Sequence, residues 1–272
     1  MNPMFTVVIP TYNRAKLIEK AIKSVIRQTY RGWKLLIVDD ASTDKTQKIV
    51  TPYLMSPNIT YFCMEKNGGI SRVMNTALAM VDTPYLVQLD SDDWLPRRAL
   101  SVLAKRIYKD SGKTALFYGN LRVWRIGKRK KRTGSKPYFH VQHKSFRTKY
   151  SFLKYNRWMV APRCYRVDAL RSVGGWDTSD KYHGRIMEDR RMILRLIEKY
   201  PIKWINRTLY NRTKHSGQLT DRKTVRKRNH LRRRTFDYYL KRWGNKYKAK
   251  YRYENGFLVI NKLVKRRRVE NK

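Results

Sequence analysis

Short apolar runs alternate with helix-spaced apolar residues through the first hundred positions of the chain. The runs are rich in β-branched residues and predict buried strands at residues 5–9, 35–38, 59–64 and 85–89. Between them, apolar residues recur at the three- and four-residue spacing of amphipathic helices, over residues 17–26, 44–53, 72–80 and 96–108. Continuous apolar strands separated by helices predict an α/β fold with a parallel sheet covered on both faces.

Polar residues follow three of these strands directly. The segments are 10–13 (Pro-Thr-Tyr-Asn), 39–40 (Asp-Asp) and 90–93 (Asp-Ser-Asp-Asp). Ligands of parallel sheets bind beyond the carboxyl ends of the strands, so we expect the three segments to meet at one crevice. Clustered carboxylates at the end of a buried strand are costly without a cation or ligand, and their oxygens suit a hard divalent ion. The alternative is that these are ordinary polar loops, with 90–93 forming a solvated acidic turn.

The charge of the chain is large and unevenly distributed. The 63 Lys and Arg residues exceed the 20 Asp and Glu residues, which gives a formal net charge of +43. Residues 1–100 contain 13 basic and 9 acidic residues, whereas residues 101–272 contain 50 and 11. A field of this sign attracts anionic partners, and the candidates are an anionic polymer, an acidic membrane face and nucleic acid.

Cysteine content and hydropathy indicate a cytoplasmic protein. The sequence has two cysteines, Cys63 and Cys164, so we expect no disulfide framework. The first apolar run, residues 5–9, is too short for a secretory signal, and no stretch approaches the ~18 apolar residues of a membrane span. Any membrane contact is therefore expected to be peripheral.

Four motifs together resemble the family 2 glycosyltransferases, in the order and at the spacing of that family. They are Val8-Ile9-Pro10-Thr11-Tyr12-Asn13, Val38-Asp39-Asp40-Ala41-Ser42-Thr43-Asp44, Asn67-Gly68-Gly69 and Asp90-Ser91-Asp92-Asp93. The resemblance covers roughly residues 4–215. It implies a GT-A fold, which is Rossmann-like with a mostly parallel central sheet and flanking helices, and an inverting transfer from a nucleotide sugar.

The resemblance implies roles for individual residues of the first half. Donor contacts are implied for Pro10, Thr11, Asn13, Asp39, Asp40, Gly69, Arg72, Asp90 and Asp93. Asp92 is the expected contact for Mg²⁺ or Mn²⁺, with Asp93 as the substitute. Arg72 departs from a related pattern, which often has Arg immediately before Asn75, where this chain has Met74. The alternative role for Arg72 is that of a surface arginine on a helix.

A Glu-Asp pair in the second half resembles the family segment that supplies the catalytic base. Glu188 and Asp189 follow residues 173–177 and precede an apolar helical face, and the amides of a helix N-terminus stabilise a carboxylate. The resemblance implies that Asp189 is the general base and Glu188 its neighbour; the alternative is a pair of first-turn charges without chemistry. His215 resembles a late histidine that reaches the metal or diphosphate, and a polar loop histidine is its alternative.

The basic excess predicts further contacts. The run 128–132 (Lys-Arg-Lys-Lys-Arg) is typical of an exposed loop, and residues 136–158 interleave aromatic and cationic residues where the family shapes its acceptor site. From residue 221 onward we expect a helix with cationic faces, which fits an interfacial helix on anionic lipid or a nucleic-acid contact. The tail 265–268 continues the basic trend.

We therefore predict a GT-A domain at 1–215, with a nucleotide-sugar half at 1–100 and an acceptor half with the base at 101–215, and a basic helical extension at 216–272. The predicted activity is metal-assisted, inverting transfer of a sugar, with a UDP-sugar as first choice, to a cell-surface, lipid-linked or anionic glycan. We expect it in the cytoplasm, peripherally at the inner membrane face. Two alternative functions remain: a polyanion-binding protein on a glycosyltransferase-like scaffold, and a peripheral scaffold without activity. Nucleic acid is a disfavoured partner.

Overall fold

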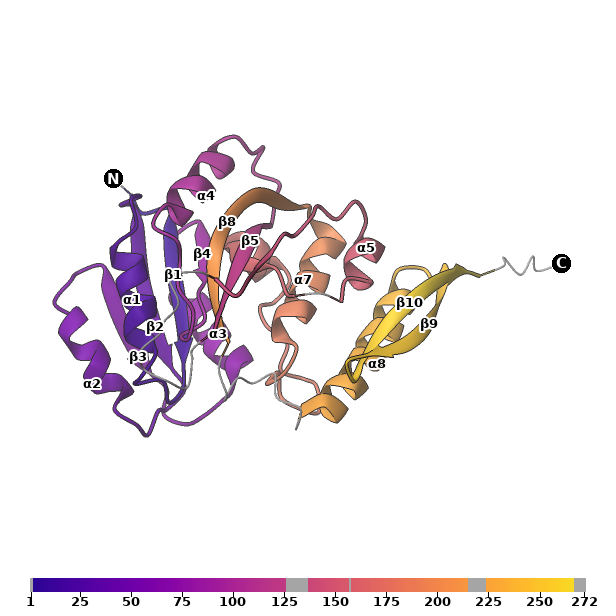
Figure 1. Cartoon of the computed structure of the whole chain (residues 1–272), viewed down its shortest axis with the longest axis horizontal. Coiled ribbons are helices and arrows are strands. Elements are labelled where there is room, and N and C mark those ends of the chain that lie inside the picture. Colours follow the sequence, from indigo (N-terminus) through magenta and orange to yellow (C-terminus); the bar gives the residue numbers. More distant parts are fainter. Residues whose placement is uncertain (1, 126–136, 157, 215–223, 267–272) are drawn as a thin grey trace. The chain divides into compact units, whose positions relative to one another are not determined.

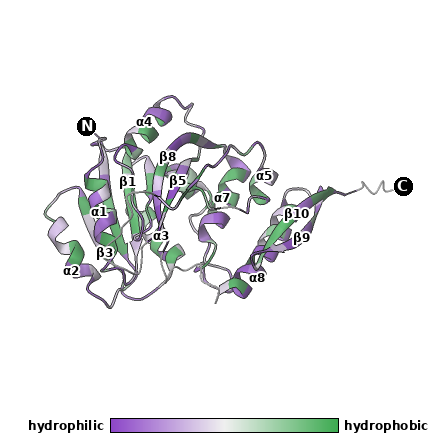
Figure 2. Cartoon of the chain, in the orientation of Figure 1, coloured by the Kyte–Doolittle hydropathy of each residue, from purple (hydrophilic) through white to green (hydrophobic). Residues whose placement is uncertain are grey.

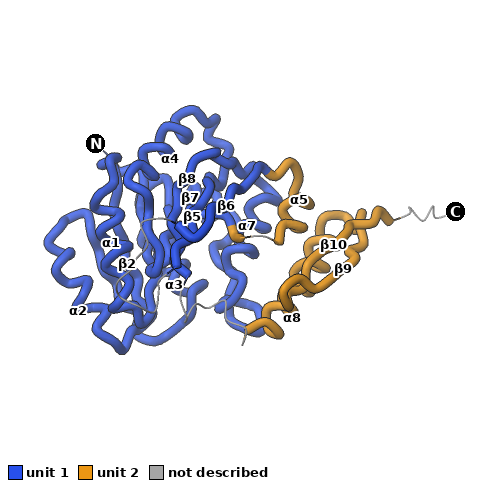
Figure 3. Tube along the Cα trace, in the orientation of Figure 1, with its two compact units in different colours: residues 1–145, 160–215 blue, residues 146–159, 216–272 orange. Residues whose placement is uncertain are grey.

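The computed structural model describes residues 2–125, 137–156, 158–214 and 224–266. The chain forms two compact units, which Figure 3 distinguishes by colour. Unit 1 consists of residues 1–145 and 160–215, and unit 2 consists of residues 146–159 and 216–272. The sequence analysis placed residues 146–159 in the first domain, but they pack with the C-terminal segment, where the Tyr150 hydroxyl donates to the Trp243 carbonyl at 3.0 Å.

Unit 1 is built on a mixed sheet with the order β3-β2-β1-β4-β7-β5-β6, and β8 pairs with β5 outside this order (Figure 1). Its strands are β1 (Phe5–Thr11), β2 (Trp33–Asp39), β3 (Ile59–Cys63), β4 (Tyr85–Gln88), β5 (Leu116–Arg125), β6 (Phe139–Val141), β7 (Ala161–Arg166) and β8 (Ile202–Lys214). The first four strands run parallel, whereas β7 is antiparallel to both β4 and β5. The expected α/β fold with a mostly parallel central sheet is confirmed.

Helices connect the strands and bury their apolar sides. In unit 1 they are α1 (Ile18–Ile26), α2 (Thr46–Val50), the 3₁₀ turn η1 (Thr51–Tyr53), α3 (Ile70–Met80), α4 (Ala99–Tyr108), α6 (Val167–Ser172) and α7 (Glu188–Lys199). Ile18, Ile22 and Val25 of α1 are fully buried, and so is every residue of β1. This continuous burial explains why the strands form unbroken apolar runs in the sequence, which Figure 2 shows as green strands within unit 1.

The register of the parallel strands brings the polar segments to one edge of the sheet. Thr11 pairs with Asp39, and Val8 pairs with Gln88, so β1, β2 and β4 end at neighbouring positions. The amide of Asp40 donates to the carbonyl of Thr11 at 2.9 Å, which continues the pairing beyond the strands. The segments 10–13, 39–40 and 90–93 therefore follow adjacent strands at the carboxyl edge of the sheet.

Unit 2 contains α5 (Lys149–Leu153), α8 (Val225–Arg242) and a hairpin of β9 (Tyr247–Glu254) and β10 (Phe257–Lys265). The expected helix is present at 225–242, but the prediction of a wholly helical extension is wrong because residues 247–265 form the hairpin. Its turn is Asn255-Gly256, with φ of 48° and 82°, and Asn-Gly is a strong hairpin signal. The two-residue alternation of cationic positions in 247–252 is the strand period that the helical interpretation missed.

Two expectations from composition can be compared with the structure. Both cysteines are free, with Cys63 exposed and Cys164 buried. Within the described ranges, no helix has both the length and the apolar character that a membrane crossing requires.

Candidate functional site

The acidic segment after β4 is fixed by the last residues of β8. The amide of Asp90 donates to the hydroxyl of Tyr210 at 3.1 Å, and the amide of Thr213 donates to the carboxylate of Asp93 at 2.7 Å. Trp94 forms two further backbone hydrogen bonds with the same strand, of 3.0 and 2.9 Å. The segment is therefore anchored at both of its ends, as pre-organised charges require.

One buried arginine joins the acidic segment to the Glu-Asp pair. Arg163 lies on β7 opposite Gln88 of β4, and 6% of its side chain is exposed. Its guanidinium donates to the Asp90 carboxylate at 2.8 Å and lies 3.5 Å from the Asp189 carboxylate. Burial opposes the charge of Arg163, but the Asp90 and Asp189 carboxylates and two neighbouring tyrosines together outweigh burial and keep the pKa of Arg163 above its ordinary value. Two carboxylates that are far apart in the sequence thus share one cation.

The Glu-Asp pair begins α7, as the sequence predicts. Met187, the residue before the pair, has a left-handed backbone with φ of 58°. Such a conformation costs about 1–3 kcal/mol for a residue with a side chain and is frequent at functional sites. Burial, followed by the Asp189 carboxylate, raises the pKa of Glu188 to about 8. Glu188 is therefore largely protonated at neutral pH, so the pair does not carry two full negative charges.

Asp39 and Asp40 order the loops beside them. Asp39 is fully buried, and its carboxylate accepts from the amide and hydroxyl of Ser42 at 2.9 and 2.6 Å and from the Tyr61 hydroxyl at 2.7 Å. Asp40 is also buried, and it accepts from the Gly68–Gly69 amides at 2.6 and 2.8 Å. The two carboxylates thus fix the strand-end loops, and their contact with a nucleobase stays a prediction.

The segment after β1 combines buried anchors with one exposed ring. Pro10 and Thr11 are buried, and the Thr11 hydroxyl has no hydrogen-bond partner among the described residues. Tyr12 is 43% exposed immediately beyond the strand. Asn13 has φ of 52°, and its side-chain oxygen accepts from the amides of residues 43–44 at 2.8 and 3.2 Å. Asn13 therefore couples the first loop to the second, and Tyr12 presents an aromatic face beside them.

The Gly68–Gly69 turn lies against arginine side chains. Gly69 has φ of 83° and ψ of 163°, a combination that is nearly restricted to glycine, and a Cβ there would lie 2.6 Å from Cγ of Arg185. Arg185 donates to the side-chain and backbone oxygens of Asn67 at 2.6 and 3.0 Å. Arg72 is exposed on α3, with its side chain against Gly68. Its contact with a diphosphate stays a prediction.

The loop before α7 is tied to two helices. Arg191 of α7 donates to the carboxylates of Asp177 and Asp180. Asn75 of α3 exchanges two hydrogen bonds with the backbone of Trp176, of 2.8 and 2.7 Å. These contacts fix the loop at both of its ends, so the Glu-Asp pair at the start of α7 has a defined position.

The acidic segment can be tested for its fit to a divalent cation. Asp93 is 2% exposed, and burial, followed by the carboxylates of Asp92 and Asp90, raises its pKa well above the ordinary value. A divalent cation would neutralise this excess of negative charge. Within the described ranges no group of three or more His, Cys, Asp or Glu side chains is arranged for a metal ion, but Mg²⁺ commonly binds one or two carboxylates together with substrate phosphates. The half-buried Asp92 fits that role, and His215 lies outside the described residues.

Sequence reasoning missed the arginines of this site. Arg163, Arg185 and Arg191 each bind an acidic or loop residue described above, and none was predicted. The signal for Arg163 was present, because a charged residue inside the apolar segment 161–165 implies a buried partner. Arg185 and Arg191 gave no comparable signal, since arginine is common in exposed loops and helices.

The structure describes most of the aromatic segment 136–158 but not the basic run 128–132. Within 136–158, the rings of Phe146, Phe152 and Tyr155 pack on one another in unit 2, with centroids 5.0 Å apart around Phe146. Phe152 and Tyr155 are buried, so these rings contribute to a core and not to an open acceptor face.

The sequence of the chain is similar to the sequences of known proteins. The family model described as Glycosyl transferase family 2 matches residues 6–171. The putative colanic acid biosynthesis glycosyl transferase WcaA of Escherichia coli K12 is 41% identical over 108 residues, which are 39% of this chain and 38% of WcaA. Chondroitin synthase of Escherichia coli is 29% identical over 232 residues, which are 84% of this chain and 32% of the synthase. The matched segments thus span about a third of the length of these relatives.

A solved structure shows the same fold at lower identity. S. aureus TarS 1–349 in complex with UDP-GlcNAc has a TM-score of 0.62 and 22% sequence identity, over 80% of this chain and 60% of that chain. At this level of identity the likeness concerns the fold alone, and it confirms the expected GT-A-like architecture.

Proposed function

Since the chain belongs to glycosyl transferase family 2, we propose that it transfers a sugar from a nucleotide-diphosphate donor to a hydroxyl of a glycan, with inversion at the anomeric carbon. The observation that carries this proposal is the guanidinium of Arg163. It lies against Asp90 of the proposed donor-binding loop and against Asp189 of α7, the proposed general base. Donor binding and proton removal would therefore take place next to each other.

The donor nucleotide binds at the edge formed by β1, β2 and β4. The exposed ring of Tyr12 offers a stacking face for the base. Arg72 and Arg185, which flank the Gly68–Gly69 turn, supply cations for the diphosphate. Uridine is the first choice of base, which the UDP-GlcNAc complex of TarS supports.

Asp189 removes the proton of the acceptor hydroxyl. Its side chain is 22% exposed, so a substrate can reach it, and the amides at the start of α7 favour its charged form. The acceptor oxygen forms a bond to the anomeric carbon as the bond to the diphosphate breaks, and this single displacement inverts the centre. A positioned base of this kind contributes about 10²–10⁴-fold to the rate.

Mg²⁺ or Mn²⁺ fits the acidic segment, with Asp92 as the direct contact and Asp93 as the substitute. When bound, such an ion stabilises the charge that develops on the leaving diphosphate. The residues of the chain keep the segment in position for it, through the backbone hydrogen bonds of Asp90 and Trp94 to β8.

The acceptor in this proposal is an anionic or lipid-linked cell-surface glycan. The net charge of +43 suits an anionic substrate, and the names of WcaA and chondroitin synthase refer to polysaccharide synthesis. Because the chain spans about a third of these relatives, the acceptor, the linkage and a peripheral place at the cytoplasmic membrane face all belong to the proposal.

Asp189→Asn tests the proposal, and Asp168→Asn is its matched control. Asp168 also lies in the first turn of a helix and pairs with an arginine, Arg166. With nucleotide sugars and Mn²⁺, donor turnover by Asp189→Asn should fall by about 100-fold or more, while the control keeps its turnover. Both variants are assayed well below their melting temperatures, so that unfolding does not contribute. Equal turnover in Asp189→Asn and the wild type would refute the base, and a failure of every common nucleotide sugar to react or to raise the melting temperature would refute the transferase.

The polyanion-binding rival makes a different prediction for the same variants. Binding of a polyanion needs cationic surface and no general base, so under that rival Asp189→Asn changes no measured activity. Loss of turnover together with retained polyanion binding therefore separates the two functions.

A further inference from the structure

Unit 2 carries more positive charge than its packing requires. Its residues 146–159 and 216–272 include 24 Lys and Arg against 4 Asp and Glu, a net charge of +20. Like charges at this density repel one another and oppose the compact state. An anionic ligand would relieve that repulsion. The positions of the cations on the fold therefore indicate where such a ligand would bind.

One side of the hairpin faces α8, and the cationic residues of β9 on the other side are exposed, although Val259 on that side of β10 is buried. Tyr251 of β9 stacks on Phe236 of α8 with ring centroids 6.3 Å apart, and its hydroxyl donates to Asp237 at 2.6 Å. Asn229 of α8 forms two hydrogen bonds of 2.8 Å with the hairpin backbone. The side of β9 that carries Tyr251 thus faces α8, and the alternate residues of the strand point away from it.

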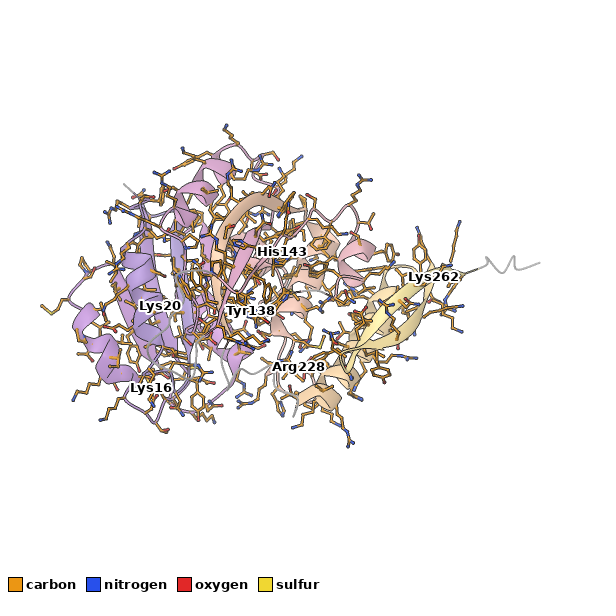
Figure 4. The ribbon with its side chains drawn as sticks, viewed as in Figure 1. Lys16, Lys20, Tyr138, His143, Arg228 and Lys262 are labelled. Atoms are coloured by element: carbon orange, nitrogen blue, oxygen red, sulfur yellow. The ribbon has the colours of Figure 1, made fainter. Side chains whose placement is uncertain are left out.

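Three exposed lysines share the outward side, and we call them the lysine face: Lys248 and Lys250 of β9 and Lys262 of β10, the last labelled in Figure 4. In the hairpin register Lys250 lies directly opposite Lys262, and directly opposed like charges destabilise a hairpin. Arg252 follows on the same side and pairs with Glu254. No ion pair formed between described residues includes a member of the lysine face.

The apolar residues of unit 2 favour a polymer over a membrane as the partner. Four apolar side chains of α8 are buried within the unit, Leu231, Phe236, Tyr239 and Leu240, whereas Tyr238 is 56% exposed. Interfacial helices need a continuous apolar side free for the lipid, and one exposed ring does not supply it, so this packing favours a polymer. The lysine face itself offers charge, with Val264 beside Lys248 as a partly exposed apolar residue.

We propose that the lysine face binds an acidic polysaccharide through its carboxylate or phosphate groups, as the acceptor chain of the transferase. Alternate residues of a strand repeat at roughly 7 Å and paired strands lie about 5 Å apart, so one extended polyanion contacts several lysines at once. Each exposed lysine–anion contact is weak and sensitive to salt. A polymer with repeated anionic groups makes several of these contacts at once, so their binding energies add. A chain bound to unit 2 stays near the transferase site of the same polypeptide, which raises its effective concentration. This inference rests on the proposed function.

The test compares two triple variants of the full chain. Lys248, Lys250 and Lys262 are changed together to Gln, and the control changes the exposed residues Lys48, Lys105 and Lys109 of unit 1 to Gln, so that both lose the same charge. Binding is measured by fluorescence anisotropy with a labelled polyuronate oligosaccharide and a labelled glycerol-phosphate polymer, with neutral dextran alongside. We expect the lysine-face variant to bind the acidic polymers about tenfold more weakly and the control to bind within about twofold of the wild type.

Four outcomes would overturn the inference. Equal weakening in both variants would show that the overall positive field of the chain causes the binding. Unchanged binding together with increased aggregation would show that the lysines protect the strand edges. The other two outcomes are binding of dextran as strong as that of the acidic polymers, and a loss of binding that affects only anionic vesicles or duplex DNA. Nucleotide-sugar hydrolysis without acceptor is measured in parallel and should be unchanged in both variants. Normal hydrolysis with unaltered polymer binding refutes the lysine face alone, whereas absent hydrolysis in the wild type refutes the transferase.

Discussion

Replacing Arg163 by methionine removes the cation that two parts of the proposed site share. The side chain is 6% exposed, and it lies 2.8 Å from the Asp90 carboxylate and 3.5 Å from that of Asp189. Unit charges 3.5 Å apart attract by about 5 kcal/mol at an effective dielectric of 20 and by about 1 kcal/mol in water. Because the carboxylates are 38% and 22% exposed, water solvates them partly in the variant. We therefore expect Arg163→Met to lower the free energy of unfolding by about 2–4 kcal/mol, near the lower end for a broken buried pair.

The same substitution should change the chemistry in a way that lost stability alone does not. Without the guanidinium, the carboxylates of Asp90 and Asp189 lose the group that holds them in place, so turnover should fall in protein that is still fully folded. Misplacement of a catalytic group should lower the rate by about tenfold or more. Denaturant unfolding measures the first effect, and donor turnover at a temperature well below the unfolding range measures the second.

Two further variants make the result interpretable. Arg163→Lys keeps the charge without the planar fork, so its stability and its donor turnover should lie between those of wild type and Arg163→Met. Arg166→Met is the control on the same strand, because Arg166 pairs with Asp168, whose side chain is 74% exposed, and such pairs contribute about 1 kcal/mol or less. If Arg163→Met unfolds like the wild type and keeps its donor turnover, the shared cation is not what holds the site together.

Two other predictions concern single groups. The pKa of Glu188 is raised to about 8, first by burial and then by the Asp189 carboxylate. The folded chain therefore binds this proton more tightly than the unfolded chain. The resulting stabilisation of the folded state is lost as the pH rises from the ordinary pKa of 4.5 to about 8. Glu188→Gln should reduce the fall in unfolding free energy between pH 5 and pH 8, and an unchanged fall would contradict the assignment. Gly69→Ala places a Cβ against Arg185 in a glycine-only conformation, so it should lose about 1–3 kcal/mol and weaken nucleotide-induced melting shifts. Gly112→Ala, at φ of 75° with no atom within 4 Å, is the matched control and should leave those shifts unchanged.

The sheet and the position of its acidic edge were predictable because burial on both faces leaves a direct trace in the sequence. Every residue of β1 and β4 is buried, so each strand forms an apolar run that stops where solvent begins. The residues at those stops, Asp39, Asp40 and Asp90, then follow adjacent strands from the register alone. Their individual contacts did not follow, since nothing in the sequence pairs Asp40 with the amides of a turn almost thirty residues away.

The second unit was harder to predict because its signals are local and conflicting. Residues 225–242 and 247–265 share one composition of cations and aromatic residues, which suggested one continuous helix. A hairpin is distinguished from a helix here by the Asn255-Gly256 turn and by the two-residue alternation of cationic positions in 247–252. The segment 146–159 joins this unit through contacts such as Tyr150 with Trp243, and contacts of that range in sequence have no periodicity that reveals them.

Backbone strain gives an independent reason to place the chemistry where these loops end. Asn13, Ala41 and Met187 have left-handed φ values of 52°, 61° and 58°, and each lies in a different loop of unit 1. Such conformations cost about 1–3 kcal/mol each, which is a large share of a typical stability of 5–15 kcal/mol. They persist because neighbouring contacts determine them, as the hydrogen bonds of Asn13 to the next loop do. Asn13 ends the first strand-end segment, Ala41 follows the second, and Met187 precedes the Glu-Asp pair. The strain thus coincides with the groups to which the proposed function assigns the reaction.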